Sequence, residues 1–200
     1  MKKLILDLCG GTGSFSKYYA KRKKEYDVEI IDIFEWDNGK KSTGDVRLAE
    51  FRKRQVHGII ASPPCTVFAN SGARWWKGRS EEEIVSNISI MDACFRICMV
   101  HDVKFWVLEN PVGKMKNYLG NYRMTFQPNE YAGWAKDPSS NQYTKRTCLW
   151  GDFVKPEKKF LPPVLGSKMH YKYGGKSTKT KMMRSMIPDG FARAFFEANR

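Results

Sequence analysis

The sequence lacks the features of a membrane or secreted protein. No run among its 200 residues approaches the roughly 18 consecutive apolar residues that a transmembrane helix needs. The apolar start Leu4-Ile5-Leu6 is interrupted by Asp7 after only a few residues. We therefore expect no secretory signal peptide and no membrane partner.

Cysteine and acidic residues are also few. The five cysteines are an odd number and, without a secretory signal, predict free thiols in a reducing cytoplasm. Only 21 acidic residues stand against 35 lysines and arginines, which leaves a formal charge of +14 and a pI near 9.6. Such an excess favours a polyanionic partner, most plausibly nucleic acid, although basic ribosomal proteins and merely soluble basic proteins share it.

What the sequence does contain is an apolar strand that stops abruptly at a cysteine. The β-branched pair Ile59-Ile60 leads into Ser62-Pro63-Pro64-Cys65. Prolines cannot donate to a sheet, so the strand must end there and present Cys65 at its carboxyl end. Ligands of open α/β sheets bind at that edge, which makes Cys65 a candidate nucleophile. The alternative is a buried, structural cysteine in an ordinary loop.

The beginning of the chain resembles a nucleotide-binding βαβ unit. A predicted strand over 4–8 leads into a glycine-rich turn and a predicted helix over 16–24. Gly11 and Gly13 would let the backbone approach a ligand closely, although tight turns without a ligand share this pattern.

The second strand is predicted over 28–33. Asp32 lies at its tip, where a carboxylate can bind two ribose hydroxyls, unless it is an ordinary turn aspartate. Asp45 follows a polar loop and could meet the base of the ligand. We expect a short, exposed, basic helix over 48–54.

Basic and aromatic residues alternate in Arg74-Trp75-Trp76-Lys77. Such a segment suits a mobile loop in which indole rings stack on bases while the cations bind phosphates. Burial of both tryptophans in the core is the alternative.

A long helix should begin near Glu81, because Ser80 and Glu83 form a capping box, and should end near Val100. Cys94, Cys98 and His101 share one face of this helix. Apolar residues lie among them and no fourth ligand has useful spacing, so we interpret these cysteines as core residues and expect no metal.

The next buried strand, predicted over 105–108, ends in Glu109-Asn110-Pro111. Glu109 should therefore lie near Cys65, at the end of the neighbouring strand. Beyond it the sequence predicts a helix over 112–119, an irregular segment over 131–142, a strand over 144–151, a lysine-rich loop over 155–185 and a final helix that starts at Ile187.

These strand-end motifs, in this order, resemble the cytosine-5 DNA methyltransferase family. Asp7-Leu8-Cys9-Gly10-Gly11-Thr12-Gly13-Ser14-Phe15 is similar to the motif that holds the methionine part of S-adenosylmethionine. Ser62-Pro63-Pro64-Cys65 matches the nucleophile motif, and Glu109-Asn110-Pro111 resembles Glu-Asn-Val. The resemblance implies a Rossmann-like S-adenosylmethionine-dependent methyltransferase fold of the α/β class, with a mostly parallel central sheet and helices on both faces.

The resemblance also implies roles for individual residues. The catalytic residues would be Cys65, which attacks carbon 6 of a flipped cytosine, Glu109 at ring nitrogen N3, and Arg146, or less favourably Lys145, at the base oxygen or its phosphate. Residues expected to bind the cofactor are Asp7, Cys9, Gly10, Gly11, Gly13, Ser14, Phe15, Asp32, Ile33, Asp45, Val46 and Pro63. Residues expected to bind DNA are Arg74, Trp75, Trp76, Lys77, Lys145, Lys172 and Lys176.

The chain departs from the family in its length. We expect a catalytic domain over 1–151, a short basic loop region over 152–186 in place of a full target-recognition region, and a C-terminal helix over 187–200 that packs back on the catalytic domain. Sequence specificity would then be short, loose or supplied by a protein partner, and the protein is expected to be a monomer. RNA cytosine-5 methylation and non-catalytic nucleic-acid binding on the same fold are the alternatives.

Overall fold

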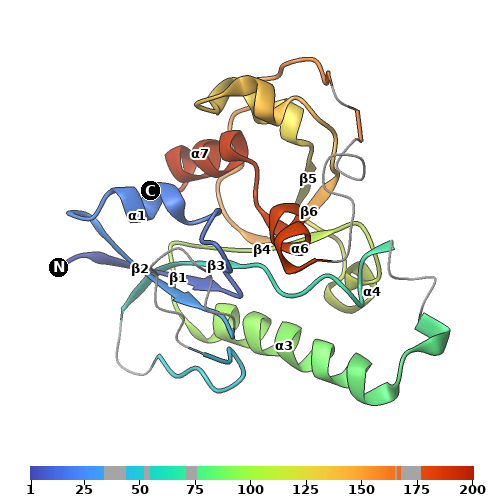
Figure 1. Ribbon diagram of the computed structural model, residues 1–200. Coiled ribbons are helices and arrows are strands. Elements are labelled where there is room, and N and C mark those ends of the chain that lie inside the picture. The colour runs from blue at the N-terminus through green and yellow to red at the C-terminus, as the bar shows by residue number, and fades with distance from the viewer. Residues whose placement is uncertain (34–43, 52–54, 71–75, 165, 168–176) are drawn as a thin grey trace.

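The computed structural model describes residues 1–33, 44–51, 55–70, 76–164, 166–167 and 177–200 (Figure 1). Its centre is a six-stranded sheet in the order β2-β1-β3-β4-β6-β5. The strands are β1 (Lys3–Leu8), β2 (Tyr26–Ile31), β3 (Val56–Ala61), β4 (Phe105–Pro111), β5 (Met124–Phe126) and β6 (Thr147–Asp152).

Strands β1 to β4 pair with one another in parallel, and β6 is antiparallel to both β4 and β5. Parallel strands need both faces covered, which explains why β1 and β3 are almost entirely apolar and buried. The carboxyl ends of β1, β2, β3 and β4 meet at one edge, so the loops that follow them share one side of the molecule.

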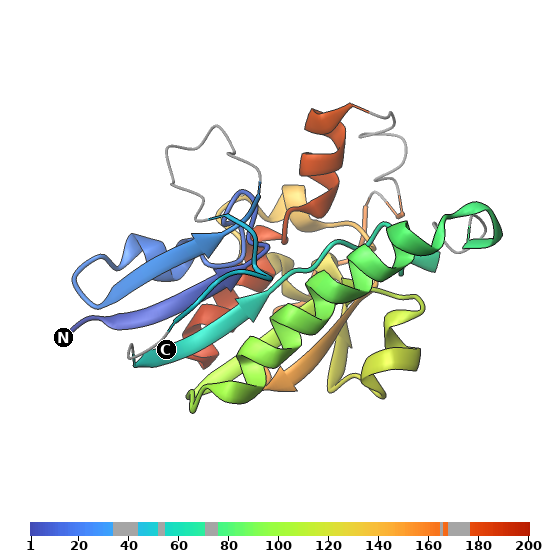
Figure 2. The ribbon, with the colours of Figure 1, turned by 90° about the horizontal axis from the view of Figure 1, so that it is seen from below.

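Helices cover both faces of the sheet. The helices are α1 (Lys17–Lys21), α3 (Glu81–Val100), α4 (Met115–Leu119), α6 (Thr178–Ser185) and α7 (Asp189–Ala198), with 3-10 helices η1 (Trp76–Gly78), η2 (Pro128–Trp134) and η3 (Pro138–Asn141). The long helix α3 crosses one face, whereas α1 and α7 lie on the other (Figures 1 and 2). The predicted α/β, Rossmann-like class is thus confirmed.

Two apolar clusters, one on each face of the sheet, make up the core. Under α3, Met91, Cys94 and Cys98 pack against β1 and β3, so the interpretation of these cysteines as core residues is confirmed. The opposite cluster is rich in aromatic rings from α1, α7 and β4. Within it Phe126 and Phe191 stack with their ring centroids 3.7 Å apart. The planes of the two rings are nearly parallel, at 5° to each other.

The long helix follows the prediction closely, from Glu81 to Val100, and the Ser80 hydroxyl accepts a hydrogen bond from the Glu83 N–H. By contrast, β4 does not stop before Pro111, which pairs with Thr147 of β6. The pairing of β3 with β4 ends at Leu108, so the last residues of β4 have a partner on one side only. A proline fits there because its missing N–H is not needed.

Two local predictions are wrong. Residues 48–51, where a helix was expected, form a turn and extended chain, and residues 52–54 lie outside the described part. The expected loop over 155–185 contains helix α6. Its N-terminus is capped by Ser177, whose hydroxyl accepts a hydrogen bond from the Thr180 N–H. In the part of the chain that the structure describes, no helix is long and apolar enough to cross a membrane.

Close packing of α7 on η2 requires a glycine. A Cβ atom on Gly190 would lie 2.1 Å from the carbonyl oxygen of Tyr131, which no side chain rearrangement can relieve. We expect Gly190→Ala to lower the free energy of unfolding by about 1–3 kcal/mol, the usual cost of overpacking, in urea denaturation. Gly78→Ala is the matched control, because a Cβ atom on Gly78 would have no other atom within 4 Å. Equal stability of the two variants would contradict the packing described here.

Candidate functional site

The glycine-rich turn after β1 is built around Asp7. This carboxyl group is fully buried, and its Oδ2 accepts a hydrogen bond from the Ser16 hydroxyl at 2.5 Å. A Cβ on Gly10 would lie 2.5 Å from the Asp7 Cγ, so only glycine fits at this position. The buried Asp7 side chain therefore fixes the shape of the turn through its contacts with Gly10 and Ser16.

The turn is joined to the end of β2. Gly11 and Gly13 adopt positive φ angles, as does Cys9. The Gly11 N–H donates a hydrogen bond to Oδ2 of Asp32 at 2.9 Å. The structure thus brings Asp32 to the glycine-rich turn, as the βαβ interpretation predicts, and places a carboxylate at the sheet edge beside exposed Ile33.

The other predicted cofactor residues divide into two groups. Asp45 lies near the surface and forms an ion pair with Arg47, which lowers the pKa of the carboxyl group. Phe15 and Val46, however, are core residues with exposed fractions of 2% and 4%. The ring of Phe15 packs against Phe191 and Phe195. These two side chains therefore support the site from within.

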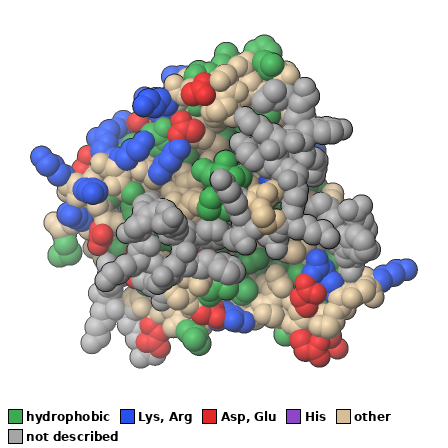
Figure 3. Space-filling model, in the orientation of Figure 1, with side chains coloured by type: hydrophobic (Ala, Val, Ile, Leu, Met, Phe, Trp, Pro, Cys, Tyr) green, Lys and Arg blue, Asp and Glu red, His purple; other side chains and the backbone are tan. Residues whose placement is uncertain are grey.

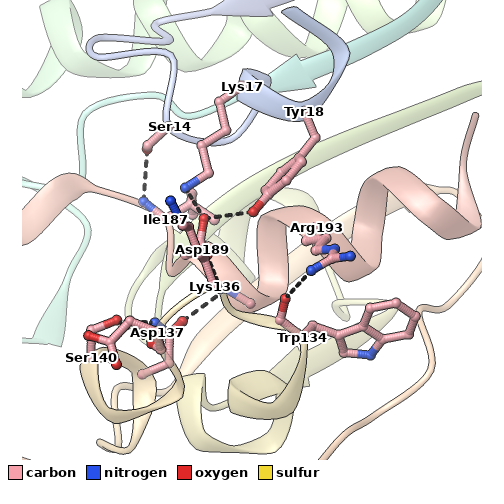
Figure 4. A network of polar contacts seen from close by, with 12 residues as sticks. Ser14, Lys17, Tyr18, Trp134, Lys136, Asp137, Ser140, Ile187, Asp189 and Arg193 are labelled. Atoms are coloured by element: carbon pink, nitrogen blue, oxygen red, sulfur yellow. Dashed lines mark hydrogen bonds and ion pairs between the residues drawn. The ribbon is translucent and has the colours of Figure 1, made fainter. Parts of the chain in front are cut away.

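The C-terminal helix is anchored to the same turn. The Ser14 hydroxyl accepts a hydrogen bond from the Ile187 N–H at 3.0 Å. Asp189, at the start of α7, binds the Lys17 ammonium, the Tyr18 hydroxyl and the backbone N–H of Lys136 (Figure 4). Burial opposes ionisation of Asp189, but these hydrogen bonds outweigh it and lower its pKa.

Cys65 follows β3 and is exposed. The segment that carries it is held by Asn110, whose amide nitrogen donates to the Pro63 carbonyl at 2.9 Å. Asn110 is fully buried and Pro63 is buried, so this bond connects the end of β4 to the nucleophile segment beneath the surface. The sequence shows a polar residue, Asn110, directly after Glu109, but only the structure shows that it binds the Pro63 carbonyl.

Glu109 lies beside Cys65, as predicted. The parallel pairing of β3 with β4 ends at Ala61 and Leu108. Glu109 and the segment that carries Cys65 follow this last pair and therefore lie next to each other. Burial raises the pKa of Glu109, while the charge of Lys145 and a hydrogen bond with Ser62 lower it in part. The carboxyl group is therefore poised to carry a proton more readily than an exposed glutamate.

Burial and neighbouring charges set the pKa of the Cys65 thiol. Desolvation by the surrounding protein and then the Glu109 carboxylate raise its pKa, whereas Lys145 and Arg184 lower it. Lys145 is half-buried and acts on both Cys65 and Glu109. Arg146 is exposed, and its charge acts instead on the buried thiol of Cys148. The structure thus brings Lys145 rather than Arg146 to the cysteine and the glutamate.

Of the predicted DNA-binding residues, Trp76 is the best defined. Its indole N–H donates to the Val67 carbonyl at 2.5 Å, and the Lys114 ammonium lies 4.2 Å from the ring centroid. The side chain is half-buried and packs against the core, so it anchors the start of η1, while Lys77 is exposed. Arg74, Trp75, Lys172 and Lys176 lie outside the described residues.

Three further features concern a pair of thiols, metal-binding clusters and the basic surface. The Cys9 and Cys94 sulfur atoms lie 3.8 Å apart, between the glycine-rich turn and α3. Among the described residues, no cluster of histidine, cysteine and acidic side chains could hold a metal ion. Exposed basic side chains gather over α1 and residues 21–24 (Figure 3).

No protein family matches the sequence, and no curated protein matches it. Two solved structures are similar in fold. A candidate DNA modification methyltransferase from an E. coli prophage is 16% identical, with a TM-score of 0.49, and the match covers 75% of this chain and 46% of that one. The methyltransferase EhMeth of Entamoeba histolytica is 13% identical, with a TM-score of 0.48, and the match covers 89% and 61%. The chain therefore spans less than two thirds of either structure.

The charges around Cys65 make its reactivity a test of this geometry. Removing the negative charge in Glu109→Gln should lower the pKa of the thiol, so that alkylation by iodoacetamide rises at lower pH than in the wild type. Lys145→Met should shift the profile in the opposite direction, because a stabilising cation is lost. Peptide mass spectrometry resolves Cys65 from the other thiols. Identical profiles for all three proteins would show that these side chains do not surround Cys65.

Proposed function

We propose that the protein is an S-adenosylmethionine-dependent DNA methyltransferase that acts on carbon 5 of cytosine. The observation that carries the proposal is the placement of Cys65, Glu109 and Lys145 together at the sheet edge that also holds the glycine-rich turn. This reaction requires a nucleophile, a group that carries a proton and a cation, all close to the cofactor site.

The residues at the turn fit the proposed cofactor. The positive φ angles of Gly11 and Gly13 suit a turn whose backbone approaches the amino-acid part closely, and the Asp32 carboxylate at the end of β2 is suited to the ribose hydroxyls. Asp45 and exposed Ile33 would supply a polar and an apolar neighbour for the adenine. When bound, S-adenosylmethionine supplies a methyl group on a positively charged sulfur.

Cys65 has the central task. Carbon 5 of cytosine is a weak nucleophile, and addition of the thiolate at carbon 6 turns the ring into an enamine that can attack a methyl group. After transfer, a proton acceptor takes the proton from carbon 5. The double bond between carbons 5 and 6 then re-forms and the carbon–sulfur bond breaks, which releases Cys65. The exposure of Cys65 at the end of β3 suits attack on a base that approaches from outside.

Glu109 assists by holding a proton at ring nitrogen N3. Its pKa is raised, which favours the neutral form that can donate a hydrogen bond to N3 while the thiolate adds. Lys145 acts on both groups and is placed to stabilise negative charge at the base oxygen. We therefore assign to Lys145 the role that the sequence resemblance gave to Arg146.

DNA is the proposed substrate because of the strong positive charge and the exposed nucleophile. A cytosine inside a duplex cannot reach Cys65, so the base must rotate out of the stack at a cost of a few kcal/mol. The same chemistry on RNA and non-catalytic binding are outcomes of the experiment that follows.

The test uses DNA that contains 5-fluorocytosine. Fluorine cannot leave as the proton does, so the enzyme should remain covalently attached through Cys65 when S-adenosylmethionine is present. We expect a band resistant to denaturing electrophoresis, with the attachment mapped to Cys65 by peptide mass spectrometry. Substrate RNA with the same modified base distinguishes the two nucleic acids.

Cys65→Ser should form no adduct, whereas Cys98→Ala removes a buried thiol under α3 and should react like the wild type. An adduct at another cysteine, or none on any duplex while the cofactor and DNA both bind, would refute the proposed reaction. An adduct confined to RNA would assign the same chemistry to a different substrate.

A further inference from the structure

The C-terminal end of helix α6 lies next to Lys145. The ammonium group of Lys145 donates a hydrogen bond to the carbonyl oxygen of Arg184 at 2.8 Å. Lys145 belongs to the segment that leads into β6, so this bond holds the last turn of α6 next to the carboxyl end of β4. It also accounts for the effect of the Arg184 charge on Cys65.

The same end of α6 is attached to the glycine-rich turn. Ile187, three residues after Arg184, donates its N–H to the Ser14 hydroxyl at 3.0 Å. The C-terminal end of α6 and the segment after it are therefore fixed at two points. Figure 2 shows that α6 projects away from the sheet. Arg184 thus has a defined backbone position beside the site.

The positive charge of Arg184 is available for a ligand. Among the described residues, no carboxylate forms an ion pair with either Lys145 or Arg184, although ion pairs occur elsewhere on the surface. Both side chains are half-buried rather than fully solvated. Because Lys145 already interacts with the Glu109 carboxyl group, Arg184 is the cation here that can attract an anionic ligand.

We propose that Arg184 of α6 binds a backbone phosphate of the nucleotide whose base lies at Cys65. This inference rests on the proposed function and adds a substrate-binding residue to it. The guanidinium group has the planar, forked geometry that pairs with two oxygens of one phosphate. Lys145 keeps its proposed role at the base, because its charge acts on both Cys65 and Glu109.

The arrangement gives α6 a specific task in substrate binding. A base that has left the stack is connected to its strand by the two flanking phosphates, and holding one of them keeps the base at the thiol. Arg184 is at the end of α6 that is attached to both Lys145 and the segment carrying Ile187. Contact with a phosphate is independent of base sequence, so α6 would contribute affinity and placement without contributing sequence specificity.

The experiment measures DNA binding by Arg184→Gln over a range of salt concentrations. Each phosphate contact that is lost reduces the slope of log affinity against log salt by about 0.9 for duplex DNA. We expect the slope of Arg184→Gln to be shallower than that of the wild type by about one unit, with weaker binding at low salt. Arg184→Lys keeps the positive charge but lacks the planar guanidinium group, and its salt slope should be close to that of the wild type.

Arg96→Gln is the matched control, because Arg96 is an exposed arginine on α3, which covers the face of the sheet opposite α1 and α7. It should leave the slope unchanged. Binding of S-adenosylhomocysteine by Arg184→Gln should also equal that of the wild type, since the hydrogen bond from Ile187 to Ser14 uses the backbone. A loss of S-adenosylhomocysteine binding in this variant would indicate a structural role and overturn the proposal.

A salt slope of Arg184→Gln equal to that of the wild type would also overturn it. The adduct experiment with 5-fluorocytosine DNA separates this failure from failure of the proposed function. Wild-type adduct with an unchanged slope in Arg184→Gln rejects only the phosphate contact. A shallower slope without any wild-type adduct supports the contact and rejects the chemistry.

Discussion

The parallel register of β3 with β4 is the constraint on which the rest of the site depends. The pairing of the two strands ends at Ala61 and Leu108, and Glu109 and the segment that carries Cys65 follow directly after this last pair. The buried hydrogen bond from Asn110 to the Pro63 carbonyl then holds the two segments against each other. A shift of the register by one residue would reverse which side chains face the core and separate the cysteine from the carboxyl group.

Around this pair, the remaining groups are added by segments that fold back to the same edge. The antiparallel strand β6 brings Lys145 from the opposite direction, and the backbone of α6 is attached to Lys145. The Ser14 hydroxyl connects the following segment to the glycine-rich turn. The proposed cofactor cradle and the proposed base site are therefore linked through α6 and Ile187, which are separated from Ser14 by most of the chain.

Much of the fold and part of the site could be predicted from the sequence. Runs of β-branched residues, prolines and glycines mark the strands and their ends, so the placement of Asp32 at the turn and of Glu109 beside Cys65 followed from local pattern. The placement of Lys145 rather than Arg146 near Cys65, the position of Arg184 and the burial of Phe15 could not be predicted in this way. They depend on contacts between segments far apart in the sequence, and composition favoured a loop where Ser177 caps a helix.

The most direct test of the account is to identify the methylated product. The protein would be incubated with unmethylated DNA and S-adenosylmethionine that carries a deuterated methyl group, and the DNA would be digested to nucleosides for mass spectrometry. The account predicts that the label appears on carbon 5 of deoxycytidine and that it is lost with Cys65→Ser. Label on an exocyclic amine, or methylation that survives Cys65→Ser, would contradict the central role of the cysteine.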